Sequence, residues 1–317
     1  MKIVWKVIAL LALLAAVAVL VTAPMPVAGA EGLENVPVYA PVTLSGNVTP
    51  IDYSEKAPYS PIESAYTADG TGYSDDTLYV KVEEFRAFNT NIQVTWVQVA
   101  DASQLRSATC SKFPSKNTMN ANKLAQREKA VLAINGDYIV YINIGVSARN
   151  GVIYRQKYSK NYEYDSLMVD VNGDFTILQN IDEEKVNAYL ADHELVHAFT
   201  FGPGLVVNGV KNEYYPLKSQ VPTHRTQRMG IGQMGPLSYV IVTTEGPDDK
   251  DSTGLTLTEF ADVFMALGAQ NAYNLDGGSS SWLVLNNKRI NGTHGSKHRA
   301  IADIIYFVTA SPDGGAI

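Results

Sequence analysis

Residues that could do chemistry gather in one stretch, Asn274-Leu275-Asp276-Gly277-Gly278-Ser279-Ser280-Ser281. A short apolar run leads into one carboxylate, and glycines and hydroxyl side chains follow it. Glycines permit positive φ and let a ligand approach the backbone closely. Successive free N–H groups in such a turn form a concave anion site. The stretch therefore predicts a loop where Asp276 meets an anionic or polyhydroxylated substrate; a polar hairpin loop capped by the aspartate is the plainer alternative.

Four further segments share this character. Each sets a charged or amide side chain, or a glycine break, at the end of an expected strand, where sheet proteins gather their functional loops. The segments are Asn135-Gly136-Asp137-Tyr138, Phe201-Gly202-Pro203-Gly204, Gln227-Arg228-Met229-Gly230 with the strand that ends at Thr244-Glu245-Gly246, and Arg299 before the last strand.

The elements that carry these loops can be predicted from periodicity. Alternation with period two predicts strands, and Asn172-Gly173 between two alternating runs predicts a hairpin over 166–178. The clearest helix begins with a capping box formed by Thr256 and Glu259 and ends at Gly268. Further strands are expected at 78–82, 92–97, 131–134, 237–244, 272, 282–285 and 304–308, and further helices at 123–129 and after Asp182. Hairpins dominate, so we expect an α+β fold with mixed, mostly antiparallel sheets, a few flanking helices and active-site loops at strand ends.

The N-terminal residues have the layout of an export signal. Lys2 and Lys6 precede the apolar run 7–21, which is short for a membrane span, and small residues suited to cleavage follow. Attachment to a membrane is expected only if this segment stays uncleaved. We predict a signal peptide over 1–30, a loosely structured spacer over 31–77 rich in Pro, Ser and Thr, a domain over 78–310, and a tail over 311–317.

Composition narrows the class of partner. The formal net charge is −7, and loss of Lys2 and Lys6 with the signal makes it −9. Such an acidic chain has no general attraction for nucleic acid or anionic lipid, so any phosphate must be held by a local cluster of donors. Cys110 is the single cysteine, which excludes an intramolecular disulfide. We expect a secreted or extracytoplasmic protein of the cell envelope with no nucleic-acid partner.

Five motifs in order resemble the phosphodiester glycosidase family. The resemblance spans about 78–308 and departs from the family pattern at Asp137, where a second glycine is common, and at Glu245-Gly246, where Asp-Gly is common. The motifs are Ala133-Ile134-Asn135-Gly136, Phe201-Gly202-Pro203, Arg228-x-x-Ile231-Gly232, Gly254-Leu255-Thr256 and Asn274-Leu275-Asp276-Gly277-Gly278.

The resemblance implies hydrolysis of a sugar 1-phosphodiester. A phosphodiester leaving group is a stable anion, so it needs cations and N–H donors more than it needs a proton. On this hypothesis Arg228, with Arg299 as second choice, holds the phosphate, and Asp276 is the nucleophile or the base for water. The remaining assignments are Asn135 on sugar hydroxyls or the oxyanion, Gly277, Gly278 and Ser279 as the cradle, and Asp137 and Glu245 as alternates for the second carboxylate, with Asp137 also a substrate ligand. His224 and Arg225 sit just before Arg228 and either line the same cleft or have no part in the site.

Each assignment has a plainer alternative. Asp276 could only cap its own turn, Arg228 could pair with a surface carboxylate, and Asn135 before Gly136 could be a tight turn. Glu245 fits a structural role better than a catalytic one. The sequence requires no cofactor. Carboxylates near Asp276 would allow a divalent cation to bind, but their spacing matches no metal-binding motif.

A competing motif is His193-Glu194-Leu195-Val196-His197, which matches the zinc protease signature H-E-x-x-H. On a helix the two histidines would share a face and the glutamate could act as a base. The motif predicts a helix that ends about one turn after His197.

Three functions follow, in order. We expect an exported hydrolase that cleaves sugar-1-phosphodiester bonds in cell-envelope or extracellular glycoconjugates. A non-catalytic binder of phosphorylated glycans is the first alternative, since it would keep Arg228 and the glycines without needing Asp276. A zinc metalloprotease built on His193 and His197 is the second.

Overall fold

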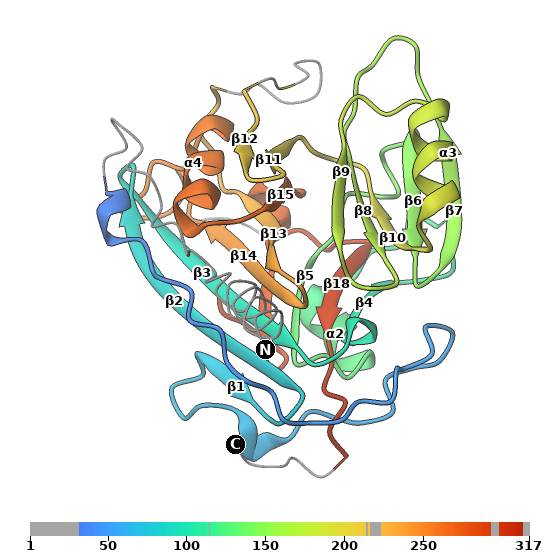
Figure 1. Cartoon of the computed structure of the whole chain (residues 1–317). Coiled ribbons are helices and arrows are strands. Elements are labelled where there is room, and N and C mark those ends of the chain that lie inside the picture. Colours follow the sequence, from blue (N-terminus) through green and yellow to red (C-terminus); the bar gives the residue numbers. More distant parts are fainter. Residues whose placement is uncertain (1–31, 114, 214, 216–222, 293–297, 313–317) are drawn as a thin grey trace, which may run out of the picture.

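The computed structural model describes residues 32–113, 115–213, 215, 223–292 and 298–312, which form three sheets with short helices on their outer faces (Figure 1). Every strand pair among these residues is antiparallel. The predicted α+β class with mostly antiparallel sheets is confirmed.

The largest sheet has eight strands and contains the predicted strand pair 78–82 and 92–97. These runs extend into a long hairpin whose turn residues, Phe88 and Asn89, both have positive φ, as a tight two-residue hairpin turn requires. In spatial order the sheet consists of β1 (Gly72–Ser74), β2 (Leu78–Ala87), β3 (Thr90–Val99), β14 (Ser238–Thr244), β13 (Met229–Gly235), β15 (Asn271–Asn274), β11 (Gly204–Val207) and β12 (Val210–Lys211).

Helix α4 (Leu257–Leu267) packs against this sheet. Its capping box at Thr256 and its left-handed C-cap at Gly268 are both present, so the helix predicted over 256–268 is confirmed. A Cβ at Gly230 would lie 3.0 Å from the Phe260 and Phe264 rings. The glycine in β13 therefore lets two aromatic rings reach the strand, and burial of each ring stabilises the fold by about 1.5–3 kcal/mol.

The second sheet carries the hairpin predicted at Asn172-Gly173 and is covered by α3 (Glu183–Asp192). Asp182 caps this helix by accepting a hydrogen bond from the backbone N–H of Lys185 at 2.8 Å, as predicted. The strands in spatial order are β7 (Val152–Lys157), β6 (Gly145–Arg149), β10 (Leu195–Phe199), β8 (Ser166–Asp170) and β9 (Phe175–Leu178).

The third sheet holds the buried strand predicted at 131–134. Helix α2 (Ala121–Arg127) packs on it through Ala121, Leu124 and Ala125, which are buried. The strands in spatial order are β17 (Lys288–Arg289), β16 (Leu283–Leu285), β5 (Leu132–Asn135), β18 (Asp303–Phe307) and β4 (Leu105–Thr109).

The main hydrophobic core lies where the three sheets meet. Ile231 of β13, Ile305 of β18 and Leu167 of β8 belong to one buried cluster. Because the sheets share this core, the loops at their ends are held at fixed positions relative to one another.

The helix predicted through His193 and His197 is wrong. Helix α3 ends at Asp192, His193 is its C-cap, and Leu195–Phe199 is strand β10, paired with β6 and β8. His197 is buried and its Nε2 lies 3.1 Å from the carbonyl oxygen of Leu105, while its Nδ1 accepts from the N–H of Asn150 at 3.2 Å. Burial lowers the pKa of His197 to about 3, so it is a neutral core residue. The two histidines do not share a helical face, and the zinc protease geometry is not formed.

The N-terminal part of the described chain is anchored to the domain. Tyr73 in β1 is fully buried in the main core, and the backbone N–H of Ile51 donates to the hydroxyl of Ser103 at 2.8 Å. The expectation of a loose spacer is therefore wrong at these anchor points, because a few apolar side chains suffice to dock an otherwise polar segment. The division of the chain at 77 stays a prediction, and the signal over 1–30 and most of the tail over 311–317 lie outside the described residues.

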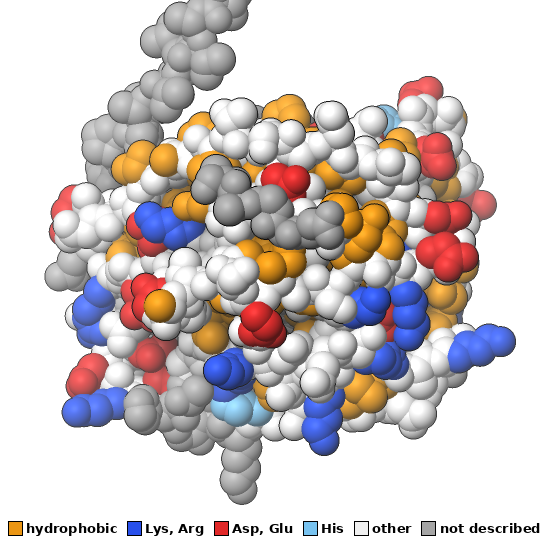
Figure 2. Space-filling model, turned by 90° about the horizontal axis from the view of Figure 1, so that it is seen from below, with side chains coloured by type: hydrophobic (Ala, Val, Ile, Leu, Met, Phe, Trp, Pro, Cys, Tyr) orange, Lys and Arg blue, Asp and Glu red, His pale blue; other side chains and the backbone are white. Residues whose placement is uncertain are grey.

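The described residues also include short 3-10 helices. The 3-10 helices are η1 (Leu33–Asn35), η2 (Glu63–Ala65), η3 (Ala102–Gln104) and η4 (Gly278–Ser280). Within the described ranges, no helix has the length and apolar character needed to cross a membrane. The face shown in Figure 2 carries Lys and Arg side chains as well as Asp and Glu side chains.

Candidate functional site

The Asp276 loop is held at both ends by Asn135. The chain leaves β15 at Asn274, and the side-chain amide nitrogen of Asn135 donates to the carbonyl oxygen of Asp276 at 2.7 Å. The amide oxygen of Asn135 accepts from the backbone N–H of Trp282 at 3.0 Å. Asn135 is buried, and both the nitrogen and the oxygen of its side-chain amide are hydrogen-bonded to backbone groups of the protein. These contacts position the loop and use both amide atoms of Asn135 within the protein, and binding of sugar hydroxyls or an oxyanion by this side chain stays a prediction.

The Asp276 carboxylate forms an ion pair with Arg299, with 2.7 Å between Oδ2 and Nη2. The Asp276 side chain is 14% exposed and that of Arg299 is 43% exposed, so the pair opens to solvent on the arginine side. Arg299 also donates from Nε to the Ser280 hydroxyl at 2.9 Å and lies over the Tyr138 ring, 4.8 Å from its centroid. Burial raises the pKa of Asp276, against the opposing effects of Ser280 and Arg299.

A pocket of about 620 Å³ opens beside this pair. It brings together Asp276, Arg228 and Arg299 with the glycines of the loop. Ser279 of the loop and Tyr138 also line it, and Phe201 comes from the Phe-Gly-Pro segment. The lining residues are Tyr138, Ile142, Tyr164, Phe201, His224, Thr226, Gln227, Arg228, Asn274, Leu275, Asp276, Gly277, Gly278, Ser279 and Arg299.

Arg228 supplies a second cation to this pocket. Its Nε donates to the carbonyl oxygen of Leu255 at 3.0 Å and its Nη2 to that of His224 at 2.7 Å. Among the described residues no carboxylate forms an ion pair with it. Arg228 is 6% exposed, and burial lowers its pKa to about 10, so it is still cationic at neutral pH. A buried cation without a carboxylate partner is costly, and an anion in the pocket would offset that cost.

The glycines of the loop serve close packing more than a free N–H cradle. The N–H of Gly278 donates to the carbonyl oxygen of Gln227 at 3.0 Å, so it is not available to a ligand. A Cβ at Gly277 would lie 2.7 Å from that same oxygen. Gly278 has φ +58°, with open space where a Cβ would be. The backbone cradle predicted over Gly277, Gly278 and Ser279 is thus reduced by one donor, while all three residues line the pocket.

A second carboxylate lies beside Asp276, and sequence reasoning missed it. Asp303, the first residue of β18, lines a narrow cavity together with Asn135, Gly136, Asp276 and Arg299. Gly136 is required here because a Cβ on it would lie 2.1 Å from an Asp303 carboxylate oxygen. The available signal was a single carboxylate at the head of an otherwise apolar strand.

Asp137, predicted as an alternate carboxylate and substrate ligand, is instead part of a buried triad. It is fully buried and its Oδ1 lies 2.6 Å from Nη2 of Arg149, which also lies 2.7 Å from Oδ2 of Asp303. The other oxygen of Asp137 accepts from the backbone N–H of Thr200 at 2.7 Å. These contacts turn Asp137 away from the pocket. Burial raises the pKa of Asp303, with Asp137 adding to the rise and Arg149 opposing it.

Glu245 and Arg225 also lie apart from the Asp276 pocket. Glu245 accepts from Asn91 at 2.7 Å and from Ser252 at 2.6 Å, and it lines a different pocket. Arg225 forms an ion pair with Glu259 in the first turn of α4 and donates to the carbonyl oxygen of Gly254 at 2.8 Å. Glu245 thus joins a loop to β3, and Arg225 joins its loop to the start of α4. His224, by contrast, lines the Asp276 pocket, as expected.

No metal ligand is assigned. Within the part of the chain that the structure describes, no three His, Cys, Asp or Glu side chains are grouped to hold an ion.

Comparison with known proteins gives the family and the fold. The model of a family described as phosphodiester glycosidase matches residues 128–308, more than half of the chain. The SPbeta prophage-derived uncharacterized protein YomE of Bacillus subtilis (strain 168) is 25% identical over 260 residues, which are 78% of this chain and 38% of that protein. This chain therefore spans well under half the length of that relative.

Two solved structures share the architecture. The catalytic domain of zebrafish N-acetylglucosamine-1-phosphodiester alpha-N-acetylglucosaminidase, auto-inhibited by its pro-peptide, aligns with TM-score 0.57 and 15% identity over 80% of this chain and 88% of that one. A hypothetical protein from Synechocystis aligns with TM-score 0.52 and 15% identity over 74% of this chain and 62% of that one. At these identities the likeness concerns the fold alone.

Proposed function

The chain belongs to the phosphodiester glycosidase family, and from this premise we propose that it hydrolyses sugar-1-phosphodiesters, breaking the bond between the anomeric carbon and the phosphate oxygen. The observation that carries the proposal is a single pocket lined by one carboxylate, Asp276, and two guanidinium groups, Arg228 and Arg299. A cleavable sugar phosphodiester combines an electrophilic carbon with a leaving anion, and this pocket offers a group for each.

The phosphate is held by Arg228 in this mechanism, with the solvent-open side of Arg299 as a second contact. Arg228 forms no ion pair with a carboxylate among the described residues, and the nearby Glu259 is itself paired with Arg225, so the charge of Arg228 is open to a ligand. In the reaction the bond from the anomeric carbon breaks and its electron pair leaves on the phosphate oxygen. Cations that stabilise this developing charge lower the barrier.

Asp276 acts at the anomeric carbon, either as the nucleophile or as the base that takes a proton from water. In both cases a water oxygen ends on the anomeric carbon and a phosphate monoester is released. The ion pair with Arg299 holds the carboxylate in place, and Asn135 fixes the backbone from which it projects. Asp303 and Arg149 lie behind Asp276 and support this wall of the pocket.

The substrate is proposed to be a glycoconjugate outside the cytoplasm. The export-signal layout of residues 1–30 supports this location. N-terminal sequencing of the protein recovered from its native host, with fractionation of cytoplasm from envelope and medium, tests it. A cytoplasmic protein that keeps residues 1–30 would refute the proposed location.

Turnover of a synthetic N-acetylglucosamine-1-phosphodiester with a chromogenic aglycone tests the activity. We expect a free sugar and a phosphate monoester as products. Cleavage on the other side of the phosphate would give a sugar 1-phosphate and would contradict the mechanism. Binding of sugar-1-phosphodiesters without any cleavage would instead favour a glycan-binding module.

A further inference from the structure

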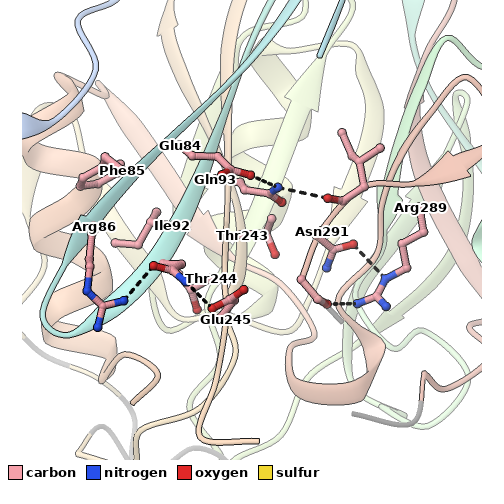
Figure 3. A pocket seen from close by; sticks show the side chains of 13 residues that line it. Glu84, Phe85, Arg86, Ile92, Gln93, Thr243, Thr244, Glu245, Arg289 and Asn291 are labelled. Carbon is pink, nitrogen blue, oxygen red and sulfur yellow. Dashed lines mark hydrogen bonds between the residues drawn. The ribbon is translucent and has the colours of Figure 1, made fainter. Parts of the chain in front are cut away.

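A second pocket, of about 470 Å³, is drawn in Figure 3. It shares no lining residue with the Asp276 pocket, and the proposed function makes no use of it. We call it the Thr243 pocket. Its walls come from the β2–β3 hairpin, the end of β14 and the segment after β17. The lining residues are Glu84, Phe85, Arg86, Asn91, Ile92, Gln93, Thr243, Thr244, Glu245, Arg289, Ile290, Asn291 and Gly292. Its volume is within the range of small-molecule sites.

Three polar atoms in this lining are buried without a hydrogen-bond partner among the described residues. They are Oε1 of Gln93, Oγ1 of Thr243 and Nη1 of Arg289. Thr243 is only 2% exposed. Leaving one such group unsatisfied costs about 1–3 kcal/mol. The three atoms differ in kind, since the first accepts, the second donates or accepts, and the third donates.

The charges of the pocket oppose an anionic ligand. Glu84 accepts from the Gln93 amide at 2.7 Å, and Glu245 accepts from Asn91, so two carboxylates face the same space as Arg86 and Arg289. A phosphate here would meet these carboxylates as well as the guanidinium groups. A neutral ligand avoids that repulsion.

A hydroxyl group both donates and accepts, so the hydroxyls of a ligand match unpaired atoms of all three kinds. Ile290, which is partly buried, also lines the pocket and offers an apolar contact that suits the C–H face of a sugar ring. We infer that the Thr243 pocket binds a neutral carbohydrate unit.

The lining of the Thr243 pocket is hydrogen-bonded to the loop that carries Asp276. Nη2 of Arg289 donates to the carbonyl oxygens of Ser281, at 3.3 Å, and Gly292, at 3.0 Å. Asn291 also donates to the carbonyl oxygen of Ser281, at 3.0 Å. Arg289 and Asn291 thus connect the lining of the Thr243 pocket to Ser281 of the Asp276 loop. Binding in the Thr243 pocket requires no step of the proposed hydrolysis, and it can be tested on its own.

The test uses the whole chain with isoleucine and threonine methyl groups labelled for NMR. Neutral gluco-, manno- and N-acetylglucosamine oligosaccharides, and inorganic phosphate, are titrated separately. We expect at least one neutral oligosaccharide to shift the methyl signals of Ile290 and Thr243, and phosphate not to shift them.

Thr243→Val removes the buried hydroxyl, and we expect it to weaken binding of that oligosaccharide by about threefold to tenfold, the effect of one hydrogen bond. Thr95→Val is the matched control, because Thr95 is a fully buried threonine of β3 whose hydroxyl also lacks a partner, and it does not line the pocket. The control should bind as the wild-type protein does.

Three outcomes overturn the inference: no neutral saccharide shifts these signals, phosphate shifts them, or Thr95→Val weakens binding as much as Thr243→Val does. Asp276→Asn should leave this binding unchanged, so failure of the proposed hydrolysis and failure of this inference give different results.

Discussion

Replacement of Asp276 by asparagine is the sharpest test of the proposed chemistry. Asparagine keeps the size of the side chain but can neither attack the anomeric carbon nor take a proton from water. A positioned base alone contributes about 10²- to 10⁴-fold. We therefore expect kcat for a sugar-1-phosphodiester to fall by about 10³-fold or more.

The same replacement should leave the fold almost unchanged. The carboxylate is 14% exposed and its partner Arg299 is 43% exposed, so the ion pair is partly screened by solvent. Loss of such a pair costs up to about 1 kcal/mol. The backbone carbonyl of Asp276, which Asn135 binds, is retained in the variant. Urea unfolding should thus give a midpoint close to that of the wild-type protein.

Asp262→Asn is the matched control. Asp262 lies on α4, is 12% exposed and forms an ion pair with Lys211 at 2.6 Å, so its burial and pairing resemble those of Asp276 outside any pocket used in the mechanism. It should keep full activity. A well-folded Asp276→Asn protein that turns over substrate at the wild-type rate would remove Asp276 from the mechanism. An equal loss in both variants would show that the effect is structural.

Further predictions concern the residues behind Asp276. Burial raises the pKa of Asp303, so the folded protein holds the carboxyl proton more tightly than the unfolded chain does. The unfolding free energy of the wild type, relative to that of Asp303→Asn, should therefore fall as pH rises above the ordinary carboxylate pKa. A difference in urea unfolding that does not change with pH would contradict this. Arg149→Met leaves two buried carboxylates without their cation and should cost about 3–5 kcal/mol in the same assay, whereas Arg127→Met at the surface should cost little; equal costs would refute the ion-pair argument. Gly136→Ala places a Cβ 2.1 Å from an Asp303 oxygen and should lower both Tm and activity, while Gly235→Ala, with no atom within 4 Å, should change neither; a Gly136→Ala protein with wild-type Tm would show that the strand can shift.

Local features of the sequence were enough to predict most elements and the character of the site. The capping box at Thr256, the Asn172-Gly173 hairpin and the cap at Asp182 all depend on neighbours a few residues away, and the structure confirms each. Loops with glycines and charged residues at strand ends could be predicted as well, because they too are recognised from a few consecutive residues. The ordered motifs also gave the family, which the match over residues 128–308 confirms.

Tertiary structure alone decided which charged residues meet. Asp137 and Asp303 are both carboxylates at strand ends, but the pairing of β5 with β18 sets Ile304 opposite Asn135 and brings Asp303 against Gly136. Arg149, from the second sheet, then holds Asp137 away from the pocket. Such contacts join residues far apart in the chain, so no local spacing encodes them.

The segment from His193 to His197 also shows that local spacing alone does not determine the structure. Its spacing fits one face of a helix, yet Leu195 to Phe199 pair with two strands and bury their side chains. Burial in a sheet outweighs a weak local preference, because backbone pairing and side-chain packing both favour the strand. The sequence by itself determined which residues could do chemistry, and strand pairing across the three sheets determined which of them share the pocket.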